Sequence, residues 1–325
     1  MRRAMDSQWG LLISIAGLVI LGCIPLLGNI YYTGLLTVIA IHTMVTVGLC
    51  LLMGYAGQVS LGHAAFYGLG AYISAILSAT YGWSPWLSLA AAVAVTGLVA
   101  YLIGGLLFQL CGHYLAMATL GFGIIVYRIF EHLKGLTGGY SGLTGIPPLA
   151  IGGLAFDNDF KFFYLAWAIC IGVLILSRNV VHSRMGRALR SVHDDEAAAE
   201  ALGVDVASAK VKVLALSAAY AATAGALYAH YVTFISPQPF GFMFSVQLVV
   251  MAVIGGVASI WGAIFGTAAI TISREFLHGF GDLDVIAYGL VLVVVMIFMP
   301  QGLLPAIRDL WARRVERREG KGGKA

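Results

Sequence analysis

A glycine-rich segment carrying three clustered polar side chains is the part of this sequence best suited to hydrogen-bond a small solute. Residues 54–72 read GYAGQVSLGHAAFYGLGAY and hold Gln58, Ser60 and His63. Glycine is unfavourable inside helices and lets backbones approach closely, so we expect an irregular segment rather than a continuous helix. Two interpretations stay open: polar groups that line a path, or a close-packed seam of small residues in which His63 hydrogen-bonds a free carbonyl.

The cysteines and histidines do not show the spacing of a metal or redox site. Cys23, Cys50, Cys111 and Cys170 are isolated in or beside apolar runs, which indicates small buried apolar residues. No Cys/His ligand spacing and no HxxxH or HExxH set occurs, so we expect no metal site and no enzyme built on the histidines. A GxxxxGK[ST] phosphate-binding loop is also absent, and we expect no ATP hydrolysis by that route and no catalytic residues.

The most informative polar segment is residues 177–212, SRNVVHSRMGRALRSVHDDEAAAEALGVDVASAKVK. Three arginines recur at every third position from 184 to 190 and therefore share one helical face. Asp194 or Asp195 can cap a short alanine-rich helix that begins at Glu196, and Gly203 suits the left-handed position after it. The pattern predicts a compact helix–turn–helix whose alanine face fits a groove of another protein. A solvated loop whose arginines meet anionic lipid explains the arginines but not the alanine turn.

Composition indicates a membrane protein. Of the 325 residues, 60% are hydrophobic and only 10% are charged, and the mean hydropathy is +0.91, whereas a soluble domain carries about 25% charged residues. These values exclude a soluble globular enzyme, a disordered protein and a coiled coil. No Lys, Arg, Asp or Glu lies in the middle of an apolar run. Because ion-coupled carriers usually keep an ionisable residue at mid-membrane, the pathway suits a neutral or zwitterionic solute.

The apolar runs predict the architecture. They are residues 11–28, 30–53, 64–80, 87–110, 114–130, 162–176, 213–234, 246–272 and 286–299. Since a helix needs about 20 residues to cross the hydrocarbon, we expect an all-α polytopic membrane protein of about 8–10 transmembrane helices, some broken or re-entrant. Residues 1–305 are predicted to form one transmembrane domain and residues 306–325 a basic tail. The residues predicted to line the translocation path are Gly54, Gly57, Gln58, Ser60, Gly62 and His63.

The distribution of Lys and Arg predicts the orientation. Fifteen of the 19 lie in the N-terminus, in residues 177–212 or in the tail, and the positive-inside rule places these segments in the cytoplasm. Six apolar runs precede residues 177–212, and three follow them. Because residues 177–212 and the tail are both placed in the cytoplasm, an even number of membrane crossings must separate them. Residues 246–272 must therefore break and return, between Gly255-Gly256 and Ser259. Both termini are then cytoplasmic, and residues 131–161 are external.

The external loop contains the sequence GGYSGLTGIP at residues 138–147. Its glycine, serine, threonine and proline residues predict a shaped loop rather than a helix. Two interpretations stay open, a plain connector and a docking surface for an external partner. The residues assigned to docking are Gly138, Gly139, Ser141 and Gly142.

The alanine turn resembles a known docking motif. Glu196, Ala197 and Ala198 followed by Gly203 are similar to the EAA motif, by which permeases of ABC importers dock on their ATPase subunits. With Arg187, these are the residues to which the resemblance assigns ATPase coupling. This sequence differs from the family's usual motif in the residues before Glu196, where an Asn is common. The identity of the residue that caps the short helix therefore stays open.

Further motifs extend the resemblance along the chain. Four segments look like the LivM-type permeases of branched-chain amino acid importers. They are residues 54–72, 138–147 and 184–229, and MPQGLLP at residues 299–305. They follow one another in the family's order and cover nearly the whole chain.

The resemblance implies a multi-pass subunit of a bacterial inner-membrane importer for branched-chain amino acids. Its partners would be a LivH-like permease, two cytoplasmic ATPases that bind ATP and magnesium, a periplasmic binding protein and the lipid bilayer. The chain itself would need no cofactor and would bind no nucleic acid. Related permeases serve urea, short amides or other amino acids, so the solute stays open. A secondary carrier or channel for small neutral solutes would explain the glycine-rich segments but not the alanine turn.

Overall fold

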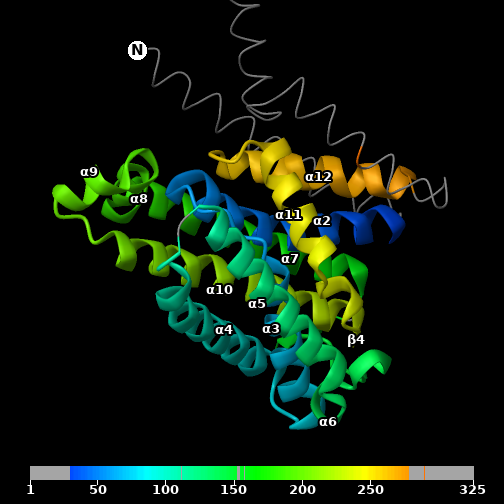
Figure 1. Cartoon of the computed structure of the whole chain (residues 1–325). Helices are drawn as coiled ribbons and strands as arrows, with labels where there is room; N and C mark the ends of the chain where they lie inside the picture. The colour runs from blue at the N-terminus through cyan, green and yellow to red at the C-terminus, as the bar shows by residue number, and fades with distance from the viewer. Residues whose placement is uncertain (1–29, 111, 152–153, 157, 278–288, 290–325) are drawn as a thin grey trace, which may run out of the picture.

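Long helices dominate the structure (Figure 1), a computed structural model that describes residues 30–110, 112–151, 154–156, 158–277 and 289. Within these residues, five helical stretches are long and apolar enough to cross a membrane. They are α2 (Ile30–Cys50) with its π-helical end η2 (Leu51–Tyr55), α4 (Pro85–Leu107), α5 (His113–His132), α7 (Asp159–His182) and α10 (Val206–Val232). The prediction of an all-α polytopic membrane protein is confirmed.

The described helices follow the predicted apolar runs, with ends shifted by a few residues. The run at 64–80 forms α3 (His63–Ala75), of 13 residues, and the π-helical turn η3 (Ile76–Thr80), of 5 residues. Together they are shorter than the roughly 20 residues of a straight span. The run at 11–28, the run at 286–299 apart from residue 289, and the predicted tail lie outside the described residues.

The expectation of an irregular glycine-rich segment is right for residues 57–62 and wrong for residues 63–72. Residues 57–62 are non-helical, whereas α3 is regular from His63 onward. In α3, a Cβ at Gly70 would overlap the backbone of Ala222, and one at Gly225 of α10 would overlap the carbonyl oxygen of Tyr67. The two backbones therefore touch, and this close packing outweighs the low helix propensity of glycine.

The predicted break after Gly255 is present. α11 (Phe242–Gly255) and α12 (Ile260–Leu277) are bent by 120° relative to each other. Gly256, at φ +101°, takes a conformation that side-chain-bearing residues rarely adopt. Gly255 and Gly262 face each other across the bend, where a Cβ on either would overlap the other's carbonyl.

Helix α10 lies at the centre of the described bundle. α2, α3 and α4 pack on it, and α7, α11 and α12 pack on α2. An aromatic cluster fills the space between α3, α5 and η5 (Gln238–Phe240). Its rings belong to Tyr67, Tyr72, Phe130 and Phe240, with centroids 4.4–6.2 Å apart.

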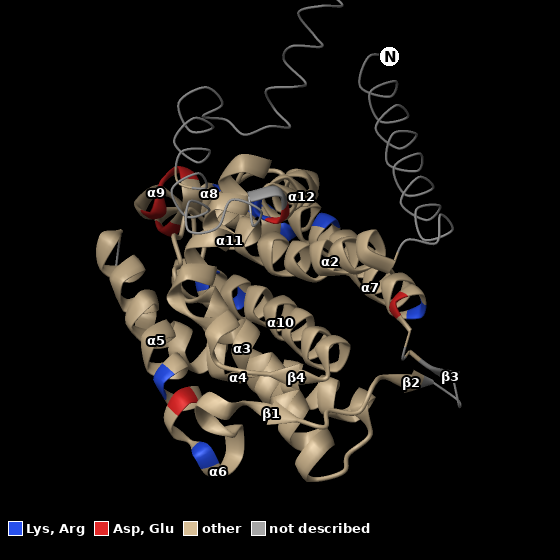
Figure 2. Ribbon diagram, turned by 90° about the vertical axis from the view of Figure 1, so that its right-hand side faces the viewer, with Lys and Arg blue, Asp and Glu red and all other residues tan. Residues whose placement is uncertain are grey.

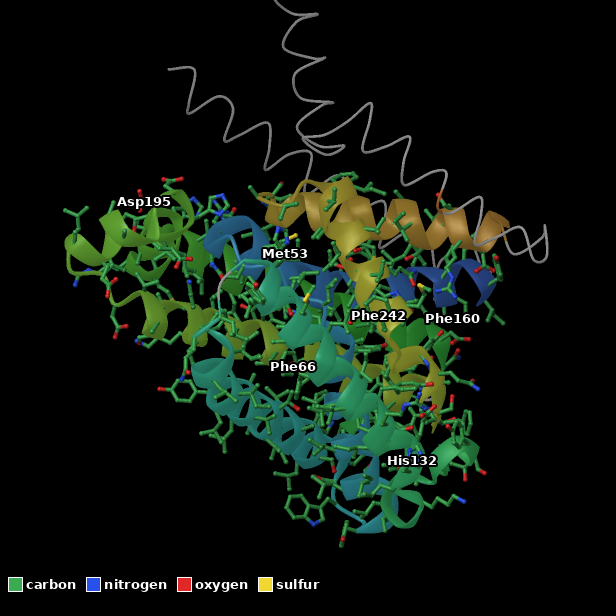
Figure 3. All side chains as sticks on the ribbon, viewed as in Figure 1. Met53, Phe66, His132, Phe160, Asp195 and Phe242 are labelled. Carbon is green, nitrogen blue, oxygen red and sulfur yellow. The ribbon has the colours of Figure 1, made fainter. Side chains whose placement is uncertain are left out.

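The connecting segments gather at the two ends of the bundle. At one end lie α8 (Arg184–Asp194) and α9 (Glu196–Ala201). The other end holds α6 (Lys134–Thr137), η4 (Gly139–Ser141), the hairpin β2 (Ala150–Ile151) and β3 (Leu154–Ala155), and β1 (Leu143–Thr144) paired antiparallel with β4 (Phe234–Ile235). Figure 3 labels Asp195 at the first end and His132 at the second. Charged residues are concentrated near these ends (Figure 2).

Candidate coupling and translocation site

Side-chain caps define the helical projection formed by α8 and α9. The Ser183 hydroxyl accepts hydrogen bonds from the backbone N–H groups of Met185 and Gly186 and so starts α8. Asp195, not Asp194, caps α9, because its Oδ1 accepts from the N–H of Ala198 at 3.0 Å. Gly203 has the expected left-handed conformation, with φ +83°. Each boundary follows from local capping chemistry.

One face of α9 is free of covering residues in the described structure. Ala197 and Ala198 are exposed, Ala199 is buried against the bundle, and Leu202 directly after the helix is 83% exposed. Arg187 of α8 is also exposed. α9 therefore presents small apolar side chains to solvent, and α8 presents a positive charge. Leu202 is not among the residues predicted for this site, although the 3.6-residue periodicity from Ala198 places it on this face.

The carboxylate of Glu196 connects α9 to two other segments. Its Oε1 lies 2.6 Å from Lys210 Nζ and accepts a hydrogen bond from Gln58 Nε2 at 3.1 Å. The Lys210 side chain is only 4% exposed, whereas Glu196 is 43% exposed. A buried ammonium needs a partner, so this ion pair fixes the start of α9 on α10. Gln58 connects the glycine-rich segment to the same Glu196 oxygen by a hydrogen bond.

The glycine-rich segment lies against α8 at Gly57. Gly57 has φ +69°, and its α-carbon lies beside His193, where a Cβ would be 2.7 Å from the His193 Nδ1 atom. The neighbouring Tyr55 ring stacks under the guanidinium of Arg190, 5.7 Å from the centroid. Arg190 also donates to the carbonyl of Val181 at 2.9 Å.

The same segment also lies against the bend between α11 and α12. The Tyr55 hydroxyl donates to the carbonyl of Ala258 at 2.8 Å. A Cβ at Gly54 would overlap the carbonyl of Val257. The two broken stretches of the chain thus meet each other beneath the helical projection. Glycine at position 54 is what allows the two backbones to approach.

The polar residues of the segment are buried and hydrogen-bonded within the chain. His63 is fully buried, with Nδ1 3.0 Å from Ser60 Oγ and Nε2 2.6 Å from Ser217 Oγ. A Cβ at Gly62 would lie 2.5 Å from the carbonyl oxygen of Thr119. His63 therefore joins α3 to α10 rather than capping a broken helix. Gln58, Ser60, Gly62 and His63 are thus buried in a packed core next to the projection, whereas Gly54 is half-buried and Gly57 is exposed.

The predicted docking loop at the opposite end is well structured. Gly138 and Gly142 both have φ +74°, and a Cβ on Gly142 would overlap the carbonyl of Ile235 in β4. Gly139 is buried, while Tyr140 and Ser141 are exposed. The expectation of a shaped loop is confirmed. Its exposed tip, residues 140 and 141, is available for contact with other molecules.

The chain is a multi-pass membrane protein. It combines membrane-length helices with a capped projection at one end and a broken helix pair. The sequence profile of a family described as branched-chain amino acid transport system, permease component, matches residues 31–300. The chain belongs to this family.

Named relatives agree with this assignment. The chain is 31% identical over 295 residues to the high-affinity branched-chain amino acid transport system permease protein LivM of Salmonella typhimurium, covering 84% of this chain and 69% of the relative. It is 28% identical to BraD of Pseudomonas aeruginosa, covering 83% and 93%. It is 25% identical to LivH of Escherichia coli, covering 81% and 91%. No solved structure matches.

Proposed function

We propose that this chain is the permease subunit of an ABC importer for branched-chain amino acids, and that α9 receives the movement of an ATPase subunit. The observation that carries the docking assignment is the Glu196 carboxylate, bound by both Lys210 and Gln58. A partner that displaces α9 pulls on this oxygen and thereby on the glycine-rich segment. The chain itself serves no catalytic step, and ATP and magnesium are bound by the partner ATPases.

The likeness of the chain to both LivM and LivH supports pairing with a homologous permease. Two permeases present two projections, which supports two ATPases on the cytoplasmic side. A periplasmic binding protein would deliver the solute to the opposite end, where Gly138, Gly139, Ser141 and Gly142 shape the loop. The bacterial relatives support a location in the inner membrane. The distribution of Lys and Arg supports placing both chain termini in the cytoplasm.

Coupling follows from how residues 54–58 are held. They contact α8 through Gly57 and Tyr55, α9 through Gln58, and the α11–α12 bend through Gly54. Movement of the projection therefore reaches both broken stretches at once. Because non-helical backbone is tolerated at membrane depth only in protein or beside a cavity, these stretches are the natural place for a path to open.

Two substitutions on the projection test the docking assignment. Ala198→Arg places a long charged side chain on the exposed face, and Gly203→Val forces a β-branched residue to a φ of +83°. Ala207→Arg is the matched control, because Ala207 is an exposed alanine at the start of α10, outside the projection. The measurement is copurification of the ATPases together with leucine-stimulated ATP hydrolysis in proteoliposomes.

We expect the first two variants to lose both properties while the permease still inserts and the control behaves as wild type. Full ATPase binding and coupled hydrolysis in the Ala198 and Gly203 variants would contradict the docking assignment. A secondary carrier would keep its transport in all three variants. Uptake of labelled leucine, isoleucine, valine, other neutral amino acids and urea by a deletion strain carrying the importer identifies the solute.

A further inference from the structure

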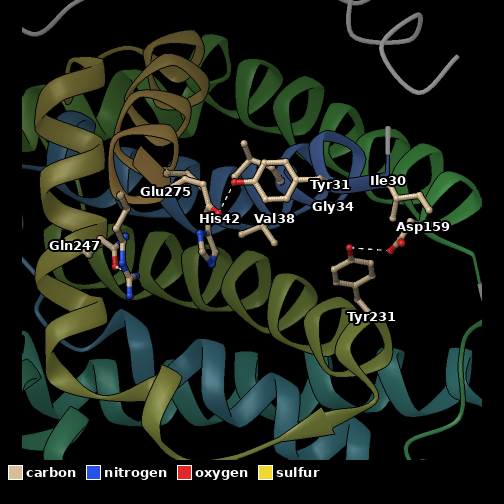
Figure 4. Close-up of a pocket in the computed structure, with 12 residues that line it drawn as sticks. Ile30, Tyr31, Gly34, Val38, His42, Asp159, Tyr231, Gln247 and Glu275 are labelled. Carbon is tan, nitrogen blue, oxygen red and sulfur yellow. Dashed lines mark hydrogen bonds between the residues drawn. The ribbon is translucent and has the colours of Figure 1, made fainter. Parts of the chain in front are cut away.

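A cavity of about 420 Å³ opens between α2, α7, α10, α11 and α12, at the bundle end opposite α8 and α9 (Figure 4). Its volume lies within the range of about 300–1,000 Å³ that is usual for small-molecule sites. Ile30, Leu35 and Val38 give it an apolar side. None of the predicted path residues lines it. The charges around it come from Asp159, Arg274 and Glu275.

Each of these charged groups is held by an uncharged partner. The guanidinium of Arg274 donates to Gln247 Oε1 at 3.1 Å. The hydroxyl of Tyr31 donates to Glu275, and that of Tyr231 donates to Asp159 at 3.0 Å. In the described part of the chain no ion pair joins the three charged groups to one another. These hydrogen bonds orient the three charged groups, and within the described residues they pair none of them with an opposite charge.

The cavity also runs along α2. It is lined by α2 from Ile30 to His42, which at 1.5 Å per residue is about 18 Å along the helix. His42 Nδ1 and Thr271 Oγ1 are buried and make no hydrogen bond within the described residues.

We propose that this cavity is a transit site for an α-amino acid zwitterion, an assignment that rests on the proposed function. Arg274 binds the α-carboxylate, for which a guanidinium offers paired N–H donors. Glu275, the neighbouring residue, binds the α-ammonium group, and Asp159 on the other side of the mouth attracts that group on entry. The aliphatic side chain lies against Val38 and Leu35. Both charged ends of the solute are then recognised, which a site for urea or a simple amide does not require.

Direct binding to the permease pair in nanodiscs, without binding protein, tests the recognition of each end. The probes are L-leucine, leucinamide, which lacks the carboxylate, and 4-methylpentanoate, which lacks the ammonium group, followed by saturation-transfer NMR. In wild type, leucine binds at least ten-fold more tightly than either analogue. Arg274→Gln lowers leucine binding to the level of leucinamide, and Glu275→Gln lowers it to the level of 4-methylpentanoate. Arg274→Lys retains part of the preference because the charge remains.

The complete importer in proteoliposomes supplies the transport readout. Arg274→Gln raises the KM for leucine uptake at least ten-fold while ATP hydrolysis without solute stays at the wild-type rate. Arg178→Gln is the matched control, because Arg178 is an exposed arginine on α7 that does not line the cavity, and it leaves the KM unchanged. Val38→Phe fills the cavity without changing charge and lowers uptake, whereas Val95→Phe on the exposed face of α4 does not.

Equal leucine binding and equal KM in the Arg274, Glu275 and Val38 variants and in their controls would overturn the transit site. If wild type itself shows no ATP-dependent uptake of any amino acid, the proposed function fails instead. Normal wild-type uptake with unaffected cavity variants removes only the transit site.

Discussion

Replacing one partner of the Glu196–Lys210 ion pair should have unequal effects on stability, depending on which partner is removed. Lys210 Nζ lies 2.6 Å from Glu196 Oε1, and the two side chains are 4% and 43% exposed. Breaking a fully buried pair costs about 3–5 kcal/mol, and an exposed pair contributes about 0.2–1 kcal/mol. For Glu196→Gln, which leaves the buried ammonium without its anion, we expect an intermediate loss of about 2 kcal/mol.

The reverse change should be milder. Lys210→Met puts an apolar side chain of similar length into a buried place, and the half-exposed Glu196 can turn to water, so we expect a loss below about 1 kcal/mol. The double variant should be more stable than Glu196→Gln alone, because no buried charge is left unpaired. Glu200→Gln, an exposed residue of the same short helix, is the matched control and should change stability by less than about 0.5 kcal/mol.

The thermal midpoint of the detergent-solubilised permease measures these differences. Cys50 and Cys170 are buried free thiols, so a thiol-reactive fluorophore reports unfolding. At roughly 2 °C per kcal/mol for a chain of this size, Glu196→Gln should lower the midpoint by about 4 °C. A loss in Lys210→Met that equals or exceeds the loss in Glu196→Gln would refute the reasoning, as would a double variant less stable than both single variants.

Three further predictions concern packing, coupling and orientation. Gly225→Ala should push α3 from α10 and lower stability by about 1–3 kcal/mol, measured by the same thermal assay; Gly105→Ala, where a Cβ meets nothing within 4 Å, should not. Gly57→Val should leave membrane insertion intact but uncouple ATP hydrolysis from uptake in proteoliposomes, because φ is +69° and a Cβ would lie 2.7 Å from a histidine ring; coupled transport in this variant would contradict the role of the segment. In spheroplasts, a membrane-impermeant thiol reagent should label Tyr140→Cys and spare Arg190→Cys, and external labelling of position 190 would reverse the predicted orientation.

Features set by local chemistry could be predicted from the sequence. The cap and the end of α9 depend on Asp195 and Gly203, whose neighbours in the chain determine their conformation. The break after Gly255 was predictable from paired glycines and from the parity of the basic segments. The approximate ends of the long helices followed from apolar runs, because the width of the hydrocarbon sets their length.

Features set by tertiary contacts could not be predicted. Gln58 and Glu196 are 138 residues apart, and only the docked projection brings them together. The helical conformation from His63 onward was missed because α10, not local propensity, stabilises glycine there. Arg274 and Asp159 were recognisable as charges at the ends of apolar runs, but nothing local indicates that they line one cavity.

The direct backbone contact between α3 and α10 restricts how the protein can move. Helices usually slide past each other by small changes in side-chain rotamers at their interface. At Gly70 and Gly225 no side chain separates the two backbones, so this adjustment is not available. α3 and α10 therefore act as one stiff lever. Displacement of one end of that pair must be absorbed by the chain segments attached to it. On the side of the helical projection these are residues 57–62, which precede α3, and residues 202–205, which join α9 to α10.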